Sequence, residues 1–210
     1  MTLISNGKDV IHLVIFSSGD FDLIRSAKRL EREAKKSRVF ASISILNTKY
    51  LLGFKDFWIP FCDFLNSGAT KGYGHWAWKP LIVRNFLDKI PQGEILLYLD
   101  AGCVLNLKGE ESLTRFKNYI TIVKKNGSLA FQLVNGMYGP NHKIELTERN
   151  LGDPELSLYL GCENFSDCNQ IEANVIFLRK SENSKKFADT WYEVCSTDNF
   201  YWIDSLRRKI

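Results

Sequence analysis

The chain has 210 residues, the length of one domain, and its 45% hydrophobic and 13% aromatic residues exclude a disordered composition. No apolar run approaches the ~20 residues of a transmembrane helix, so we expect no membrane span. The net charge of +4 is compatible with an anionic ligand but gives no reason to expect nucleic acid as a partner.

The five cysteines are irregularly spaced and odd in number, which argues against a disulfide framework. Cys162 and Cys168 have no histidines at ligand spacing, so a structural zinc site is not expected. Near the N-terminus, "VIHLVIF" is too short for a signal peptide and fits a core strand. We therefore expect a cytoplasmic protein, for which peripheral contact with a membrane stays open.

The first elements predict a parallel β-α-β unit. Residues 10–16 form a continuous apolar run, typical of a strand buried on both faces, and "SSGD" follows it. Asp20 is placed to cap a helix whose apolar residues share one face; they are Leu23, Ala27, Leu30 and Ala34. The basic stretch "AKRLEREAKKSR" favours a solvated face of that helix. Residues 39–46 predict the second strand.

The middle of the chain predicts helices around a loop. Residues 48–66 indicate a helix broken near Pro60, and residues 66–80, "NSGATKGYGHWAWKP", indicate a loop or lid. Pro80 suits the first turn of a helix over residues 81–90. Residues 94–99 then predict a central strand that ends at Asp100.

The last third predicts two more strands and two more helices. A helix is expected over 109–126, stopped by Gly127, and a strand follows over 128–134. Residues 135–172 are expected to be irregular, with a short helix near 146–151. A strand over 173–180 and a helix over 184–195 then follow, with Phe187, Trp191 and Val194 of that helix facing inward. Alternating strands and helices predict one α/β domain over residues 1–210, with a doubly wound, mostly parallel sheet flanked by helices.

In such sheets ligands bind beyond the carboxyl ends of the strands. "SSGD" and "DAGC" are both carboxyl-end loops, and the second begins with Asp100 at the end of an apolar strand. A carboxylate that ends a buried strand at this edge is a candidate ligand-binding residue.

The stretch "ILLYLDAG" resembles the metal-binding strand of GT-A type glycosyltransferases, with Gly102 in place of the usual second aspartate. The segments "WAWKP" and "YLDAGC" together resemble a bacterial set of GT-A-like proteins, and weaker similarity runs through most of the chain. The resemblance implies a nucleotide-diphospho-sugar transferase fold. It also implies a divalent cation, Mn²⁺ or Mg²⁺, with Asp100 as ligand.

The resemblance assigns residues to the donor and to the acceptor. The implied donor-binding residues are Ser17, Ser18, Trp78, Lys79, Arg84, Asp100 and Gly102, and those on the acceptor or sugar side are Gln132 and Gln170. Simpler readings stay open: the serines as turn formers, Lys79 extending past the tryptophans, and Arg84 on the surface. Trp76 and Trp78 suit stacking on a base or a core role, and alternation would put both on one side.

The catalytic residue is not selected by the sequence. Acidic candidates are Glu145, Asp153, Asp167 and Glu172, and two loop histidines, His75 and His142, are weaker metal candidates. The resemblance predicts transfer of a sugar from a nucleotide-diphosphate donor to a saccharide or lipid-linked acceptor, as in polysaccharide biosynthesis. Members of the resembled set run further at the C-terminus, so the alternative is a truncated or catalytically degenerate module that binds sugar nucleotides.

Overall fold

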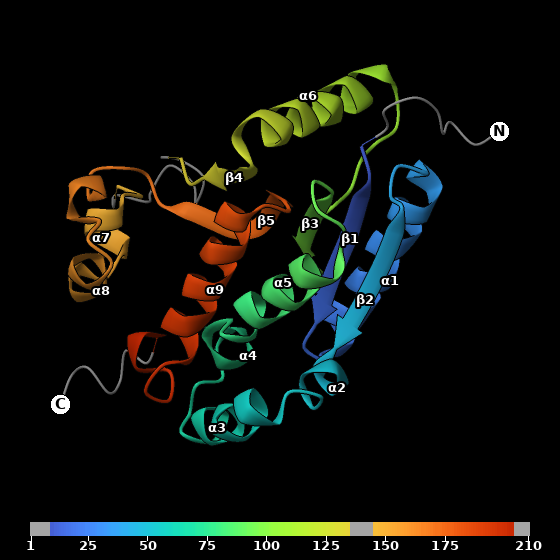
Figure 1. Cartoon of the computed structure of the whole chain (residues 1–210). Coiled ribbons are helices and arrows are strands. Elements are labelled where there is room, and N and C mark those ends of the chain that lie inside the picture. The colour runs from blue at the N-terminus through green and yellow to red at the C-terminus, as the bar shows by residue number, and fades with distance from the viewer. Residues whose placement is uncertain (1–8, 135–144, 204–210) are drawn as a thin grey trace. The chain divides into compact units, whose positions relative to one another are not determined.

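The computed structural model describes residues 9–134 and 145–203, in two compact units (Figure 1). The first unit comprises residues 1–129 and 176–210, and the second comprises residues 130–175. The chain is an α/β protein whose five strands form one mixed sheet in the order β2-β1-β3-β5-β4. Strands β4 (Ser128–Gln132) and β5 (Ile171–Arg179) each run across a boundary between the units.

Strand β1 (Ile11–Ser17) is the parallel centre of the first unit. It pairs in parallel with β2 (Ser42–Asn47) on one side and with β3 (Ile95–Asp100) on the other. Both β1 and β3 are almost fully buried, as expected for apolar runs covered on both faces. The predicted parallel β-α-β unit is therefore confirmed, whereas the sheet as a whole is mixed.

Helix α1 (Phe21–Ser37) follows β1 with the predicted cap. The Asp20 carboxylate accepts hydrogen bonds from the backbone N–H groups of Asp22 and Leu23, at 2.9 and 3.3 Å. Ala27, Leu30 and Ala34 are buried as predicted, but Leu23, in the first turn, is 37% exposed. The three residues inside the helix therefore define its packing face.

The predicted break at Pro60 is wrong. Two helices cover this region, α2 (Thr48–Leu51) and α3 (Lys55–Asn66), and the interruption falls at Gly53. Pro60 lies inside α3, where it removes one backbone donor. The buried stripe of Phe57, Phe61 and Phe64 holds α3 together against that loss.

The predicted loop over residues 66–80 is partly helical. It contains α4 (Gly72–His75) and the first turn of α5 (Trp78–Lys89). All five residues from Gly72 to Trp76 have positive φ, between 49° and 77°, so this is a left-handed turn. At Gly74 a side chain would collide with the core, because an added Cβ would lie 2.3 Å from Cε2 of Phe61.

Helices α6 (Glu110–Asn126) and α9 (Glu182–Ser196) complete the larger elements of the first unit. Gly127 ends α6 with a left-handed φ of 85°, as predicted. The expected inward position of Phe187 is wrong: its side chain is 50% exposed, because α9 turns Ser184, Ala188 and Val194 to the core instead. Trp191 is half-buried, and the short helix η2 (Tyr201–Ile203) follows.

The second unit is built from short helices. These are α7 (Glu148–Leu151), α8 (Pro154–Tyr159) and the 3-10 helix η1 (Glu163–Phe165). An antiparallel bridge joins Thr147 to Asn169. Across the described ranges, no helix has both the length and the apolar content of a membrane span.

We predict that Gly74→Ala lowers the free energy of unfolding by about 3 kcal/mol, since alanine is strained at positive φ and its methyl group overpacks Phe61. Urea denaturation measures this loss. Gly102→Ala is the matched control, because an added Cβ there meets no atom within 4 Å, and we expect a change within about 0.5 kcal/mol. Equal stability of the two variants would contradict the left-handed turn.

Candidate functional site

The candidate site lies where the chain changes direction across the sheet. From β1 the chain crosses to β2 on one side and later to β3 on the other. Right-handed crossovers in opposite directions put α1 and α5 on opposite faces of the sheet. The carboxyl ends of β1 and β3 meet at this reversal, with Phe16 paired to Asp100. This edge is the position at which open α/β sheets bind ligands.

The Asp100 carboxylate is held by two buried donors. Nζ of Lys79 lies 3.0 Å from Oδ1 and 3.1 Å from Oδ2, and the Tyr98 hydroxyl donates to Oδ1 at 2.6 Å. Lys79 is 3% exposed and Tyr98 is fully buried, whereas the Asp100 side chain is 23% exposed. Asp100 is therefore fixed from inside the protein while part of its carboxylate faces outward.

The first turn of α5 packs directly on this strand edge. The Trp78 ring stacks on Phe16 with centroids 4.0 Å apart, and the Lys79 ammonium lies 5.3 Å from the centre of the Tyr98 ring. The Lys79 N–H donates to the Trp76 carbonyl at 2.9 Å, so the left-handed turn leads straight into this helical turn. The segment "WAWKP" thus places a buried cation against the end of β3.

Tyr98 is locked in its protonated form. Burial, the nearby charge of Asp100 and the hydrogen bond to it raise the pKa of the Tyr98 hydroxyl well above its ordinary value of 10.0. The hydroxyl therefore donates to the carboxylate throughout the physiological range. With Lys79 it makes Asp100 a fixed hydrogen-bond acceptor.

The loop after β3 is tied to α1 by contacts that the sequence did not single out. Arg29 donates to the Cys103 carbonyl at 2.8 Å, and Glu33 accepts from the Leu105 N–H at 2.9 Å. Arg29 and Glu33 also pair with each other at 3.1 Å. In the sequence they look like an ordinary i,i+4 pair on a solvated helix, so only the fold reveals that they hold this loop.

The two sides of the predicted donor site lie on different faces of the sheet. Successive side chains of a strand alternate, so Asp100 and Phe16 face α5, while Ser17 faces α1. Ser17 is 4% exposed and its Oγ has no hydrogen-bond partner among the described residues. Ser18 is half-buried in the turn that follows. The strand ends are adjacent, but Ser17 and Asp100 can share a ligand only beyond the sheet edge.

The predicted arrangement of the two indoles is wrong. Trp78 is 4% exposed and stacked on Phe16, so it is a core residue with no face for a base or sugar. Trp76 is 44% exposed. The alternation expected of an extended segment does not apply, because Trp76 ends a left-handed turn and Trp78 begins a helix.

Arg84 points away from Asp100. Its guanidinium pairs with Asp189 at 2.5 Å and lies 5.0 Å from the centre of the Tyr192 ring, both on α9. It also borders a hollow of about 320 Å³ whose lining does not include Asp100. The surface role left open for Arg84 matches this position, and the structure does not bring Arg84 to Lys79.

His75 ends α4 in the first unit, and the remaining candidates belong to the second unit. The Gln170 carbonyl accepts from the N–H of Leu133, which follows Gln132, so the two predicted glutamines lie on neighbouring segments. The acidic candidates there have structural partners: Asp153 caps α8, Asp167 pairs with Arg149, and Glu172 accepts from Asn174. The side chain of Glu145 is exposed and has no partner among the described residues, and His142 lies outside them. The structure selects no catalytic base from this set.

The residues present do not fit the divalent cation implied by the resemblance. Asp100 is a single carboxylate, and the buried Lys79 ammonium lies within 3.1 Å of both its oxygens. A cation at Asp100 would lie close to the buried ammonium, which opposes binding. Within residues 9–134 and 145–203, no cluster of three or more His, Cys, Asp or Glu is placed to hold a metal ion. Gly102 supplies no ligand, and the space around it is open.

Comparison with known proteins assigns the chain to no family. No protein-family model matches it, and neither does any curated protein. Among solved structures it is similar to the crystal structure of a glycosyltransferase involved in the glycosylation of the major capsid of PBCV-1, at 12% identity. The match covers 90% of this chain and 68% of that chain, with a TM-score of 0.49. The α/β architecture is defined by the strands and helices of the chain itself, and its own site is the basis for a function.

We predict that Lys79→Met lowers the free energy of unfolding by about 2–3 kcal/mol, because it leaves the Asp100 carboxylate unpaired beside a buried side chain. In Lys79→Met/Asp100→Asn this charge is absent, so more than about 1 kcal/mol should return. Urea denaturation of both single variants and the double variant gives the coupling energy. Strict additivity would contradict the ion pair.

We predict a second effect at alkaline pH. The folded-state pKa of Tyr98 lies above its ordinary value of 10.0, so the protonated phenol contributes fully to the free energy of unfolding below pH 10.0. This contribution is lost as the pH rises from that value through the folded-state pKa. Tyr98→Phe removes the ionisable group. Its free energy of unfolding should therefore decline less steeply above pH 10 than that of the wild type. Parallel slopes in denaturation series would show that the hydroxyl is not held as described.

Proposed function

We propose that the chain is a glycosyltransferase-like protein that binds a nucleotide-diphosphate sugar at the carboxyl edge of β1 and β3. Asp100 accepts hydrogen bonds from the ribose, and the sugar passes to a saccharide or lipid-linked acceptor. In this proposal Ser17 and Ser18 border the base and ribose, and Gly102 leaves room for the donor. The roles of Gln132 and Gln170, which belong to the second unit, stay predictions. Trp78, Lys79 and Arg84 are not assigned direct donor contacts.

One observation carries the proposal: Asp100 is fixed by buried donors yet partly exposed at the topological reversal of the sheet. A carboxylate has about four lone-pair sites, and Lys79 and Tyr98 do not exhaust them. Vicinal ribose hydroxyls are donors that suit such an acceptor. Because the acceptor is already held in place, little conformational entropy is lost when the ligand binds.

A second candidate function is binding of a sugar nucleotide without turnover. It is favoured by the position of Lys79, which neutralises Asp100 rather than facing a diphosphate. It is also favoured by Gly102, which removes the carboxylate of the resembled metal-binding strand. The two functions share the donor site and differ only in whether a product forms.

We predict that UDP or GDP at millimolar concentration raises the melting temperature of the wild type, because a ligand that binds only the folded state stabilises it by mass action. Asp100→Asn should abolish the shift while keeping a similar side-chain shape. Asp189→Asn is the control, since that carboxylate pairs with Arg84 on the surface and should leave the shift intact. If no nucleotide moves the transition of the wild type, the proposal fails.

Gly102→Asp separates the role of a metal from that of the nucleotide. The position has open space and an ordinary φ, so an aspartate fits and restores the pattern of the resembled strand. A shift that is independent of Mn²⁺ in the wild type but enhanced by Mn²⁺ in Gly102→Asp supports recognition by Asp100 alone. Release of free sugar or product from a labelled sugar nucleotide then distinguishes a transferase from a binding module.

A further inference from the structure

Helix α1 carries a row of four cations that have no anionic partner within the part of the chain that the structure describes. Of its six basic residues, Arg29 pairs with Glu33 at 3.1 Å and Lys35 pairs with Glu31 at 2.5 Å. The other four are all exposed; they are Arg25, Lys28, Arg32 and Lys36. The predicted solvated helix face is therefore only partly neutralised by its own glutamates.

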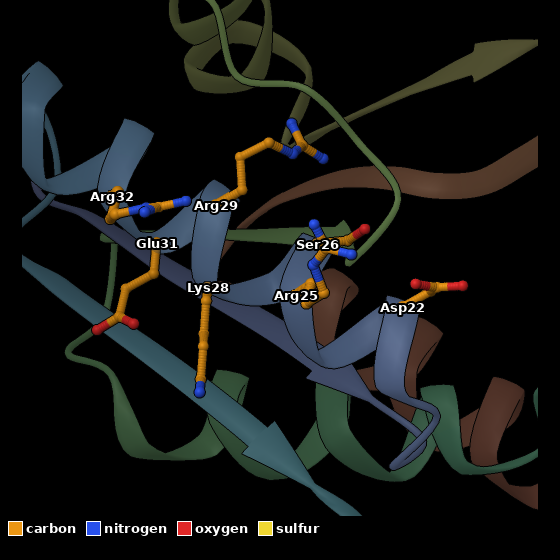
Figure 2. A pocket seen from close by; sticks show the side chains of 7 residues that line it. All are labelled: Asp22, Arg25, Ser26, Lys28, Arg29, Glu31 and Arg32. Atoms are coloured by element: carbon orange, nitrogen blue, oxygen red, sulfur yellow. The ribbon is translucent and has the colours of Figure 1, made fainter.

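The four cations lie along one side of the helix. Their spacings of three and four residues put them on a single stripe roughly 16 Å long. Figure 2 shows Arg25, Lys28 and Arg32 projecting from α1 around a hollow of about 790 Å³, which Asp22 and Glu31 also border. A second hollow of about 290 Å³ shares Arg29 and Arg32 with the first and extends the basic surface to Lys36 and Lys108.

Exposed apolar side chains lie beside this stripe. Phe21 begins α1, is 71% exposed and lies one turn before Arg25, whose guanidinium is 5.7 Å from its ring centre. Val104 is also 71% exposed, and its neighbours Cys103 and Leu105 are hydrogen-bonded to Arg29 and Glu33 of α1. The surface thus combines a row of cations with apolar groups at two points.

We propose that this face of α1, with Phe21 and Val104, docks on a membrane surface that contains acidic phospholipids. Anionic headgroups match the four unpaired cations, and the acyl boundary accepts a phenyl ring and an isopropyl group. A single-stranded nucleic acid would need aromatic platforms along the row of cations, whereas the aromatic ring here stands at one end only. This inference does not depend on sugar-nucleotide binding, because none of its residues contacts Asp100.

The test is sedimentation of the full chain with vesicles of phosphatidylcholine alone or mixed in equal parts with phosphatidylglycerol. We expect the wild type to bind only the mixed vesicles, and less tightly as salt is raised. Each cation near an acidic surface contributes about fivefold, so Arg25→Gln/Arg32→Gln should lower the partition coefficient roughly 25-fold. Phe21→Ser should also weaken binding, without changing its salt dependence.

The matched control is Lys117→Gln/Lys125→Gln on α6, which removes two exposed charges from another helix and should keep most of the binding. Equal losses in both double variants would show a mere effect of net charge and overturn the proposal. Binding of the wild type to pure phosphatidylcholine would overturn it too, as would binding to a single-stranded oligonucleotide but not to acidic vesicles. Unchanged melting temperatures show that the variants fold.

Discussion

The contact between the Lys79 ammonium and the Asp100 carboxylate is the interaction on which the candidate site depends. A lysine that is 3% exposed needs a compensating charge, and the end of β3 supplies it. The same contact fixes the first turn of α5 against the sheet and gives Asp100 its orientation. Tyr98 adds a second buried donor, so the geometry of the carboxylate is set by the core rather than by a ligand.

The left-handed turn of residues 72–76 directly precedes the helical turn that carries Lys79 and supports the contact between Lys79 and Asp100. Three of its residues, Tyr73, His75 and Trp76, are not glycines and carry the usual cost of positive φ. Packing offsets that cost: Tyr73 contacts Phe61, and His75 contacts Phe64. The Trp76 carbonyl, at the end of the turn, accepts a hydrogen bond from the Lys79 N–H. The conformation of the turn therefore helps to fix the position of the buried lysine.

The sequence predicted the parts of the fold whose signals are local. The apolar runs of β1 and β3, the Asp20 cap and the stop at Gly127 each depend on a few neighbouring residues. It failed where tertiary packing decides. Phe61 and its neighbours keep α3 intact across Pro60. The left-handed turn leaves Trp76 exposed, whereas Trp78 in the following helix is buried.

The candidate site was predictable to a similar degree. The position of Asp100 at the carboxyl edge followed from its place at the end of an apolar strand, and its nearness to "WAWKP" followed from the resemblance. The partner of each charge did not follow. Lys79 and Arg84 were both donor-binding candidates, yet Lys79 is buried against Asp100 and Arg84 pairs with Asp189 on the surface. Ion pairs between distant segments leave no periodic signal.

The ion pair between Lys79 and Asp100 has different consequences for nucleotide binding and for catalysis at this edge of the sheet. Lys79 and Asp100 cancel each other, and moving the ammonium toward a diphosphate would strip the carboxylate of its buried partner. The cation that offsets a departing diphosphate therefore has to come from elsewhere than Lys79, and Arg84 is already paired on α9. The geometry of the described residues thus accounts more directly for binding a ribose than for stabilising a leaving group.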